Sequence, residues 1–199
     1  MKADDIQSIQ AVLVKKLDAK RYQHTLGVAF TASSLAMCYG MDMEQAFLAG
    51  LLHDCAKSMS GEELIQFCQK NNIKVSAIEK KNTSLLHAKV GSVLAKEQYE
   101  ISDESIQSAI YYHTTGHPDM TELEKVIFIS DYIEPLRNHD AELKTLRQLA
   151  FKDLNLCLCY ILKHTVAYLK TSGKAIDTMT EATYEYYKDE ELKHGTDIN

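Results

Sequence analysis

Histidine and aspartate residues recur along this chain at positions where they could bind metal ions. His53 and Asp54 are adjacent, near the end of a predicted helix. The other candidates lie on both sides of this pair: His24, His87, His113 and Asp131. Imidazole nitrogens and carboxylate oxygens that converge in one place are the ligands of a two-metal hydrolytic site. A lone histidine on a helix is usually a surface residue or a hydrogen-bonded core residue, so the hypothesis depends on the whole set.

Asp54 is the natural bridge between two metal ions, because each of its oxygens can bind one ion. We expect the first ion to bind Asp54 together with His24, His53 and Asp131. We expect the second ion to bind Asp54 together with His87 and His113. Mixed nitrogen and oxygen ligands at an open site fit iron or manganese best, with zinc or cobalt as alternatives.

Asp131 is the more informative of the two carboxylates. It follows Ile127, Phe128 and Ile129, so it belongs to a strongly apolar helix. A buried carboxylate there is costly unless it is paired or bound to metal. The alternative is that each aspartate caps a helix or pairs with an arginine.

Two cations accompany these candidates at helical spacing. Arg21 lies three residues before His24, and Lys57 lies four residues after His53. On a helix, these spacings put each cation on the same face as its ligand. A phosphate bound to the metals would need cations there, and we expect Lys57 to act in catalysis with Asp54. The alternative is that both are solvated charges at helix ends.

Further candidate substrate contacts follow two of the predicted ligands. Directly after His113 comes the loop Thr114-Thr115-Gly116, whose hydroxyls and flexible backbone could bind phosphate or ribose, or form a plain turn. Glu134 lies one helical turn after Asp131 and could support a ligand or face the substrate. Arg137 is a candidate phosphate or nucleotide contact.

Almost every segment of the chain has the apolar periodicity of an amphipathic helix. The segment 22–39, for example, is predicted to bury Leu26, Ala29, Phe30, Ser33 and Met37. Capping boxes are predicted at Asp42–Gln45, Ser60–Glu63 and Thr121–Glu124, whereas residues 73–84 are polar and weakly patterned. We therefore expect an all-α bundle of roughly eight to ten helices. The prediction is one domain over residues 1–199, with C-terminal helices (about 140–192) packing on the metal-binding core.

Composition restricts the function classes. The hydrophobic fraction of 45% and charged fraction of 25% are typical of a globular protein. A net charge of -6 gives no general attraction to nucleic acid polymers or anionic membranes. The five cysteines suit a reducing cytoplasm as small core residues. We expect neither a signal peptide nor a membrane span.

Several motifs together resemble a known family. The pattern His…His-Asp…Asp is similar to that of the HD-domain metal-dependent phosphohydrolases. The segments Arg21-Tyr22-Gln23-His24-Thr25, 51–57 (LLHDCAK), 113–116 (HTTG) and 130–135 (SDYIEP) resemble the YqeK family of bacterial symmetrical diadenosine tetraphosphate hydrolases. The resemblance covers roughly residues 6–190. It implies an HD-domain helical bundle, a di-iron centre, and metal ligation by the six residues His24, His53, Asp54, His87, His113 and Asp131.

The resemblance also implies an activity. A metal-bound hydroxide would cleave diadenosine tetraphosphate symmetrically into two ADP, with iron as the expected metal and manganese or cobalt as alternatives. The other hypotheses are a different nucleotide phosphohydrolase or phosphodiesterase of the same superfamily, and a non-catalytic nucleotide-binding sensor. The Gly-Tyr-Pro signature of cyclic-dinucleotide phosphodiesterases is absent. The sequence leaves open whether the chain forms a homodimer.

Overall fold

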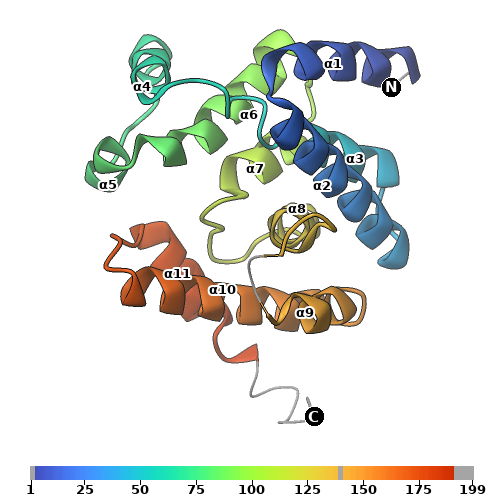
Figure 1. Cartoon of the computed structure of the whole chain (residues 1–199), viewed down its shortest axis with the longest axis vertical. Helices are drawn as coiled ribbons and strands as arrows, with labels where there is room; N and C mark the ends of the chain where they lie inside the picture. The colour runs from blue at the N-terminus through green and yellow to red at the C-terminus, as the bar shows by residue number, and fades with distance from the viewer. Residues whose placement is uncertain (1–2, 139–140, 191–199) are drawn as a thin grey trace.

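Helices form all of the regular structure in the part of the chain that the computed structural model describes, residues 3–138 and 141–190 (Figure 1). The eleven α-helices are α1 (Ala3–Lys16), α2 (Ala19–Cys38), α3 (Met43–Leu52), α4 (Gly61–Lys70), α5 (Ala77–Lys81), α6 (Leu86–Gln98), α7 (Glu104–Tyr112), α8 (Glu122–Ile133), α9 (Leu143–Ala150), α10 (Leu154–Thr171) and α11 (Thr178–Tyr187). The all-α prediction is confirmed. Residues 140, 191 and 192, at the ends of the predicted C-terminal part, lie outside the described residues.

The helix count exceeds the predicted eight to ten because of the polar segment 73–84. There the short helix α5 forms, followed by a 3-10 turn at Thr83–Leu85. Its capping box joins Ser76 and Glu79, and the buried Glu79 pairs with Lys89 of α6 at 2.8 Å. Local capping and one ion pair therefore form a helix that apolar periodicity does not indicate.

Helix starts agree well with the sequence signals. The capping boxes at Ser60–Glu63 and Thr121–Glu124 are both present. Asp42 caps α3 as predicted, but Gln45 does not complete a box. The Gln45 side chain instead donates a hydrogen bond of 2.8 Å to Asp103, the N-cap residue of α7. This contact links the starts of two helices that both end at predicted metal ligands.

The centre of the molecule is built from α2, α3, α7 and α8, which pack on one another. Helix α8 lies between the N-terminal helices and a layer formed by α9, α10 and α11 (Figure 1). Its whole middle is buried, including Ile127 and Ile129. Among the described residues, no helix is long and apolar enough to cross a membrane.

One burial prediction for α2 is wrong. Phe30 and Met37 are exposed by 61% and 63%, whereas the buried face consists largely of small residues such as Ala29 and Ala32. The reason is the close approach of α3: a Cβ added at Gly50 would lie only 2.8 Å from the Ala29 Cα. Small residues let the two helix backbones meet, and this contact brings the ligand candidates on the two helices together.

Candidate metal centre

Four histidines and two aspartates, from segments far apart in the sequence, converge at the centre of the bundle. They are His24 on α2, His53 and Asp54 after α3, His87 on α6, His113 after α7, and Asp131 on α8. All four histidines and Asp54 are buried. The structure thus brings together all six residues that the sequence singles out.

Asp54 lies between two groups of these side chains. Its Oδ2 atom is 3.4 Å from His53 Nε2 and 3.8 Å from His24 Nε2. Its Oδ1 atom is 3.1 Å from His87 Nε2 and 3.8 Å from His113 Nε2. The two oxygens of one carboxylate therefore face two separate pairs of imidazoles, which is the arrangement that a bridging ligand needs.

Asp131 completes the first group. Its Oδ1 atom lies 3.1 Å from His24 Nε2 and 3.9 Å from His53 Nε2. Ligand atoms of these three residues lie within 4.8 Å of one another, close enough to hold one metal ion. A second set within the same limit joins His53, Asp54 and His113.

The outer nitrogen of each imidazole is held by a hydrogen-bond acceptor. Nδ1 of His53 lies 2.6 Å from the Gly50 carbonyl oxygen, and Nδ1 of His113 lies 2.7 Å from that of Ile110. Nδ1 of His87 likewise contacts the Ser84 carbonyl. Since a carbonyl only accepts, each of these Nδ1 atoms carries the proton, and each Nε2 presents a lone pair to the cluster.

His24 has a charged partner instead. Its Nδ1 lies 3.1 Å from Oε1 of Glu134, whose side chain is only 2% exposed. This carboxylate–histidine pair is the arrangement that orients many metal-binding histidines. Gly27 provides the space, because a Cβ there would lie 2.5 Å from Glu134 Oε2.

The donor set passes a direct test of fit for metal ions. His24 Nε2, His53 Nε2 and Asp54 Oδ1 are buried atoms that no hydrogen bond satisfies. Buried polar atoms normally have hydrogen-bond partners. Three such atoms without a partner lie together here, and a bound metal ion would supply the missing interaction. The nitrogen and oxygen ligands suit a divalent ion of the first transition row.

Burial and charge set the protonation states of the cluster. Burial, together with the neighbouring imidazoles of His87 and His53, lowers the pKa of His113 to about 3, so its ring is neutral. Burial would raise the pKa of Asp54, but His53 and His87 hold it well below the usual value. Burial would likewise raise the pKa of Asp131, but its close contact with His24 and the charge of His53 lower it. Ionised carboxylates and a neutral imidazole are the states that bind metal.

The predicted cations surround this cluster. Arg21 Nη1 lies 2.7 Å from Asp54 Oδ2, and Arg137 Nη2 lies 2.7 Å from Asp131 Oδ1. Lys57 Nζ is 3.8 Å from Asp54 Oδ1, and burial lowers its pKa although Asp54 opposes the shift. Three cations at the rim make the site attractive to a multiply charged anion.

The three residues of the loop after His113, for which the sequence allows either substrate contact or a plain turn, have different surroundings. Thr114 lines a cavity beside the cluster. The Thr115 carbonyl instead accepts a hydrogen bond from the Thr183 hydroxyl of α11 at 3.0 Å. Gly116 is buried with φ +61, and a Cβ there would lie 2.7 Å from Thr183 Cγ2. Thr115 and Gly116 therefore anchor the loop to α11, and of the three residues only Thr114 faces the cavity.

Glu134 lies buried behind His24. Of the two roles that the sequence allows, support of a ligand or contact with the substrate, this position fits the first. The turn that carries it is held by Arg147, which donates to the carbonyl oxygens of Ile133, Glu134 and Arg137 at 2.8–2.9 Å. Sequence reasoning missed both Arg147 and Gly27, since neither belongs to a ligand motif.

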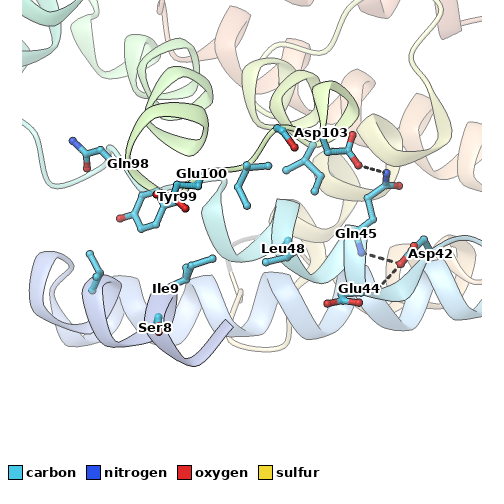
Figure 2. Close-up of a pocket in the computed structure, with 14 residues that line it drawn as sticks. Ser8, Ile9, Asp42, Glu44, Gln45, Leu48, Gln98, Tyr99, Glu100 and Asp103 are labelled. Atoms are coloured by element: carbon cyan, nitrogen blue, oxygen red, sulfur yellow. Dashed lines mark hydrogen bonds between the residues drawn. The ribbon is translucent and has the colours of Figure 1, made fainter. Parts of the chain in front are cut away.

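A second cavity, of about 560 Å³, lies away from the cluster, between α1, the start of α3 and the turn from α6 to α7 (Figure 2). Three of its polar side chains hold helix ends in place. Asp42 and Asp103 cap α3 and α7, and Gln45 bridges toward Asp103, as Figure 2 shows. None of the six ligand candidates lines it.

Comparison with known proteins gives the family. Residues 21–136 match the HD domain, a span that contains all six ligand candidates. The chain belongs to the HD-domain family. A symmetrical bis(5'-nucleosyl)-tetraphosphatase of Bacillus subtilis is 38% identical over 176 residues, covering 88% of this chain and 94% of the relative. A protein of the same name from Staphylococcus aureus is 34% identical, covering 95% and 98%.

A solved structure supports this relationship. The crystal structure of a predicted HD superfamily hydrolase involved in NAD metabolism, from Clostridium acetobutylicum, matches with a TM-score of 0.89 and 38% identity. It covers 93% of this chain and 97% of the other. Identity at this level over nearly the whole chain confirms the family indicated by the sequence, YqeK, within the HD-domain proteins.

Proposed function

We propose that this protein is a two-metal hydrolase that cleaves diadenosine tetraphosphate symmetrically into two ADP. The observation that carries the site is the position of Asp54, whose two oxygens face two separate pairs of imidazoles. The substrate comes from the named activity of the relatives from B. subtilis and S. aureus. A phosphoanhydride is a suitable substrate for such a centre, because two metals can offset the charge of a polyphosphate.

Six residues would hold the metals. His24, His53 and Asp131 would bind one ion, His87 and His113 would bind the other, and Asp54 would bind both. When bound, the ions supply Lewis acidity and lower the pKa of a water molecule. Iron is the proposed metal, with manganese and cobalt as the alternatives.

The reaction needs one water and one bond cleavage. Water attacks the phosphorus next to the central bridging oxygen, the bond between that phosphorus and the bridge breaks, and ADP leaves with the bridging oxygen. Lys57, Arg21 and Arg137 lie where they offset the charge that moves onto the phosphate oxygens. ADP is a good leaving group, so a strong general acid is not required.

The wider predictions belong to the same proposal. Residues 1–199 form one functional unit, in which α9 to α11 cover α8, the helix that carries Asp131. The protein acts in the cytoplasm on a dinucleotide, without nucleic acid polymers or membranes as partners. Formation of a homodimer stays a prediction.

Metal removal and restoration test the proposal. Protein treated with chelator should lose hydrolysis of diadenosine tetraphosphate, and iron or manganese should restore it. Activity that persists after complete metal removal would contradict the two-metal site. Tight binding of the dinucleotide without turnover in the metal-restored protein would favour the nucleotide sensor instead, and turnover of other nucleotides alone would favour a different hydrolase of the superfamily.

A further inference from the structure

Arg147 of α9 binds the end of α8, the helix that carries Asp131. Its Nε atom donates to the carbonyl oxygen of Ile133 at 2.8 Å, and its Nη2 atom donates to those of Glu134 at 2.9 Å and Arg137 at 2.8 Å. The last carbonyl groups of a helix have no partner within that helix, and a cation is favourable beside them because of the helix dipole. One guanidinium group from another helix therefore caps α8 and fixes the turn that follows it.

The backbone that Arg147 holds positions two metal-ligand candidates. Asp131 lies on the last turn of α8. His24 is contacted by Glu134, whose Oε1 atom lies 3.1 Å from its Nδ1 atom. The other oxygen of Glu134, Oε2, accepts a hydrogen bond of 2.8 Å from the backbone N–H of Leu136, so the carboxylate is fixed within the turn itself. A shift of this turn would therefore move the partner of His24 together with the end of the helix that carries Asp131.

His87 and His113, the ligand candidates on the other side of the cluster, are held by different parts of the chain. Nδ1 of His87 contacts the carbonyl oxygen of Ser84, and Nδ1 of His113 lies 2.7 Å from that of Ile110. Neither acceptor belongs to α8, to α9 or to the turn after α8. A change at Arg147 should therefore affect one group of ligands and leave the other in place.

We infer that Arg147 is a positioning residue for the metal ion that His24 and Asp131 would bind. This inference rests on the proposed function, since it needs a centre with two metal sites. Arg147 lies beyond residues 21–136, which match the HD domain. Its helix, α9, lies in the layer with α10 and α11 (Figure 1) and supplies none of the six ligand candidates. Through Arg147, this C-terminal layer sets the affinity of one of the two metal sites.

Equilibrium titrations with Mn²⁺, in which the free ion is measured by electron paramagnetic resonance, test this role. The wild type should bind two ions per chain. R147A should bind one ion as the wild type does and the other about 10-fold more weakly, the usual effect of removing a group that orients a metal ligand. R147K keeps the charge at the end of α8 but lacks the planar set of donors, so its loss for the same ion should be smaller. K144A removes an exposed cation from the same helix and should bind both ions like the wild type.

Combined variants identify the ion that is affected. H87A should retain the ion bound by His24 and Asp131, and the addition of R147A should weaken the binding of that ion about 10-fold. H24A should retain the other ion, and the addition of R147A should leave its affinity unchanged. Circular dichroism of each metal-free variant establishes that the chain is folded before the titration, and R147K takes the place of R147A if R147A does not fold.

Weaker binding confined to the ion that H87A retains supports the positioning role. Every other result overturns it: equal weakening of both ions, wild-type affinity for both ions in R147A and R147K, or a wild type with a single manganese site. Turnover of diadenosine tetraphosphate by the wild type, measured separately, tests the proposed function. Two bound ions without turnover would leave the role of Arg147 intact while the proposed activity fails.

Discussion

His24 Nδ1 lies 3.1 Å from Glu134 Oε1, in a buried pocket that the absence of a side chain at Gly27 leaves open. This pair fixes the orientation of an imidazole whose other nitrogen faces Asp131 at 3.1 Å. A carboxylate behind a metal-binding histidine strengthens and orients that ligand. The relationship shows how a residue outside the ligand motif takes part in forming the site.

Replacing Glu134 by glutamine should weaken metal binding about 10- to 100-fold, the usual effect of removing such a partner. G27A should have a similar effect, because its Cβ would lie 2.5 Å from Glu134 Oε2 and displace the carboxylate. The control is G91A, another helical glycine, whose Cβ would meet nothing closer than 3.4 Å. Metal dissociation constants of the folded variants measure the effect; equal affinities for all of them would refute this role of Glu134.

Replacing Asp54 by alanine should abolish turnover and lower the metal content below two ions per chain. Both oxygens face imidazole nitrogens at 3.1–3.8 Å, so no neighbouring group can replace them. D119N, which changes an exposed aspartate far along the chain, should keep both properties. Elemental analysis together with activity provides the measurement, and a fully active D54A protein would exclude this site.

Replacing Arg21 or Arg137 by alanine should lower kcat/KM about 10- to 100-fold, the effect of losing one charged hydrogen bond to a phosphate. Metal content should change little, because neither side chain is a ligand. K152A removes an exposed cation outside the cluster and serves as the control. Kinetic constants at several salt concentrations distinguish the cases; unchanged kinetics for both arginine variants would place the phosphates elsewhere.

The sequence indicated the six metal-ligand candidates correctly as a group, but not the packing of the helices around them. All six ligand candidates lie on helices or directly after them, and most of these helices have clear apolar or capping signals in the sequence. The burial of Phe30 and Met37 was predicted wrongly, since hydrophobicity does not reveal that α2 packs through small residues against Gly50. The direction in which the Glu134 side chain points could not be predicted either. The prediction assumed that Glu134 continues the helix of Asp131, but α8 ends at Ile133 and Glu134 has ψ 152, which is not helical.

Thiol reactivity tests the predicted burial of the cysteines. Only Cys38 is exposed, whereas Cys55, Cys68, Cys157 and Cys159 are buried. Burial raises the pKa of Cys55 and of Cys157 to about 12, so at pH 8 both thiols stay protonated and unreactive. A thiol reagent should therefore modify one cysteine in the native protein and five after unfolding, and C38S should abolish the native reaction. Rapid modification of several native thiols would contradict the packing of the core.

The products of diadenosine tetraphosphate hydrolysis test the central claim most directly. Metal-loaded protein is incubated with the dinucleotide, and the nucleotides are separated by chromatography. Attack next to the central bridging oxygen predicts ADP as the sole product. Formation of AMP and ATP would contradict the proposed position of attack, and the absence of turnover with iron or manganese present would contradict the assigned activity.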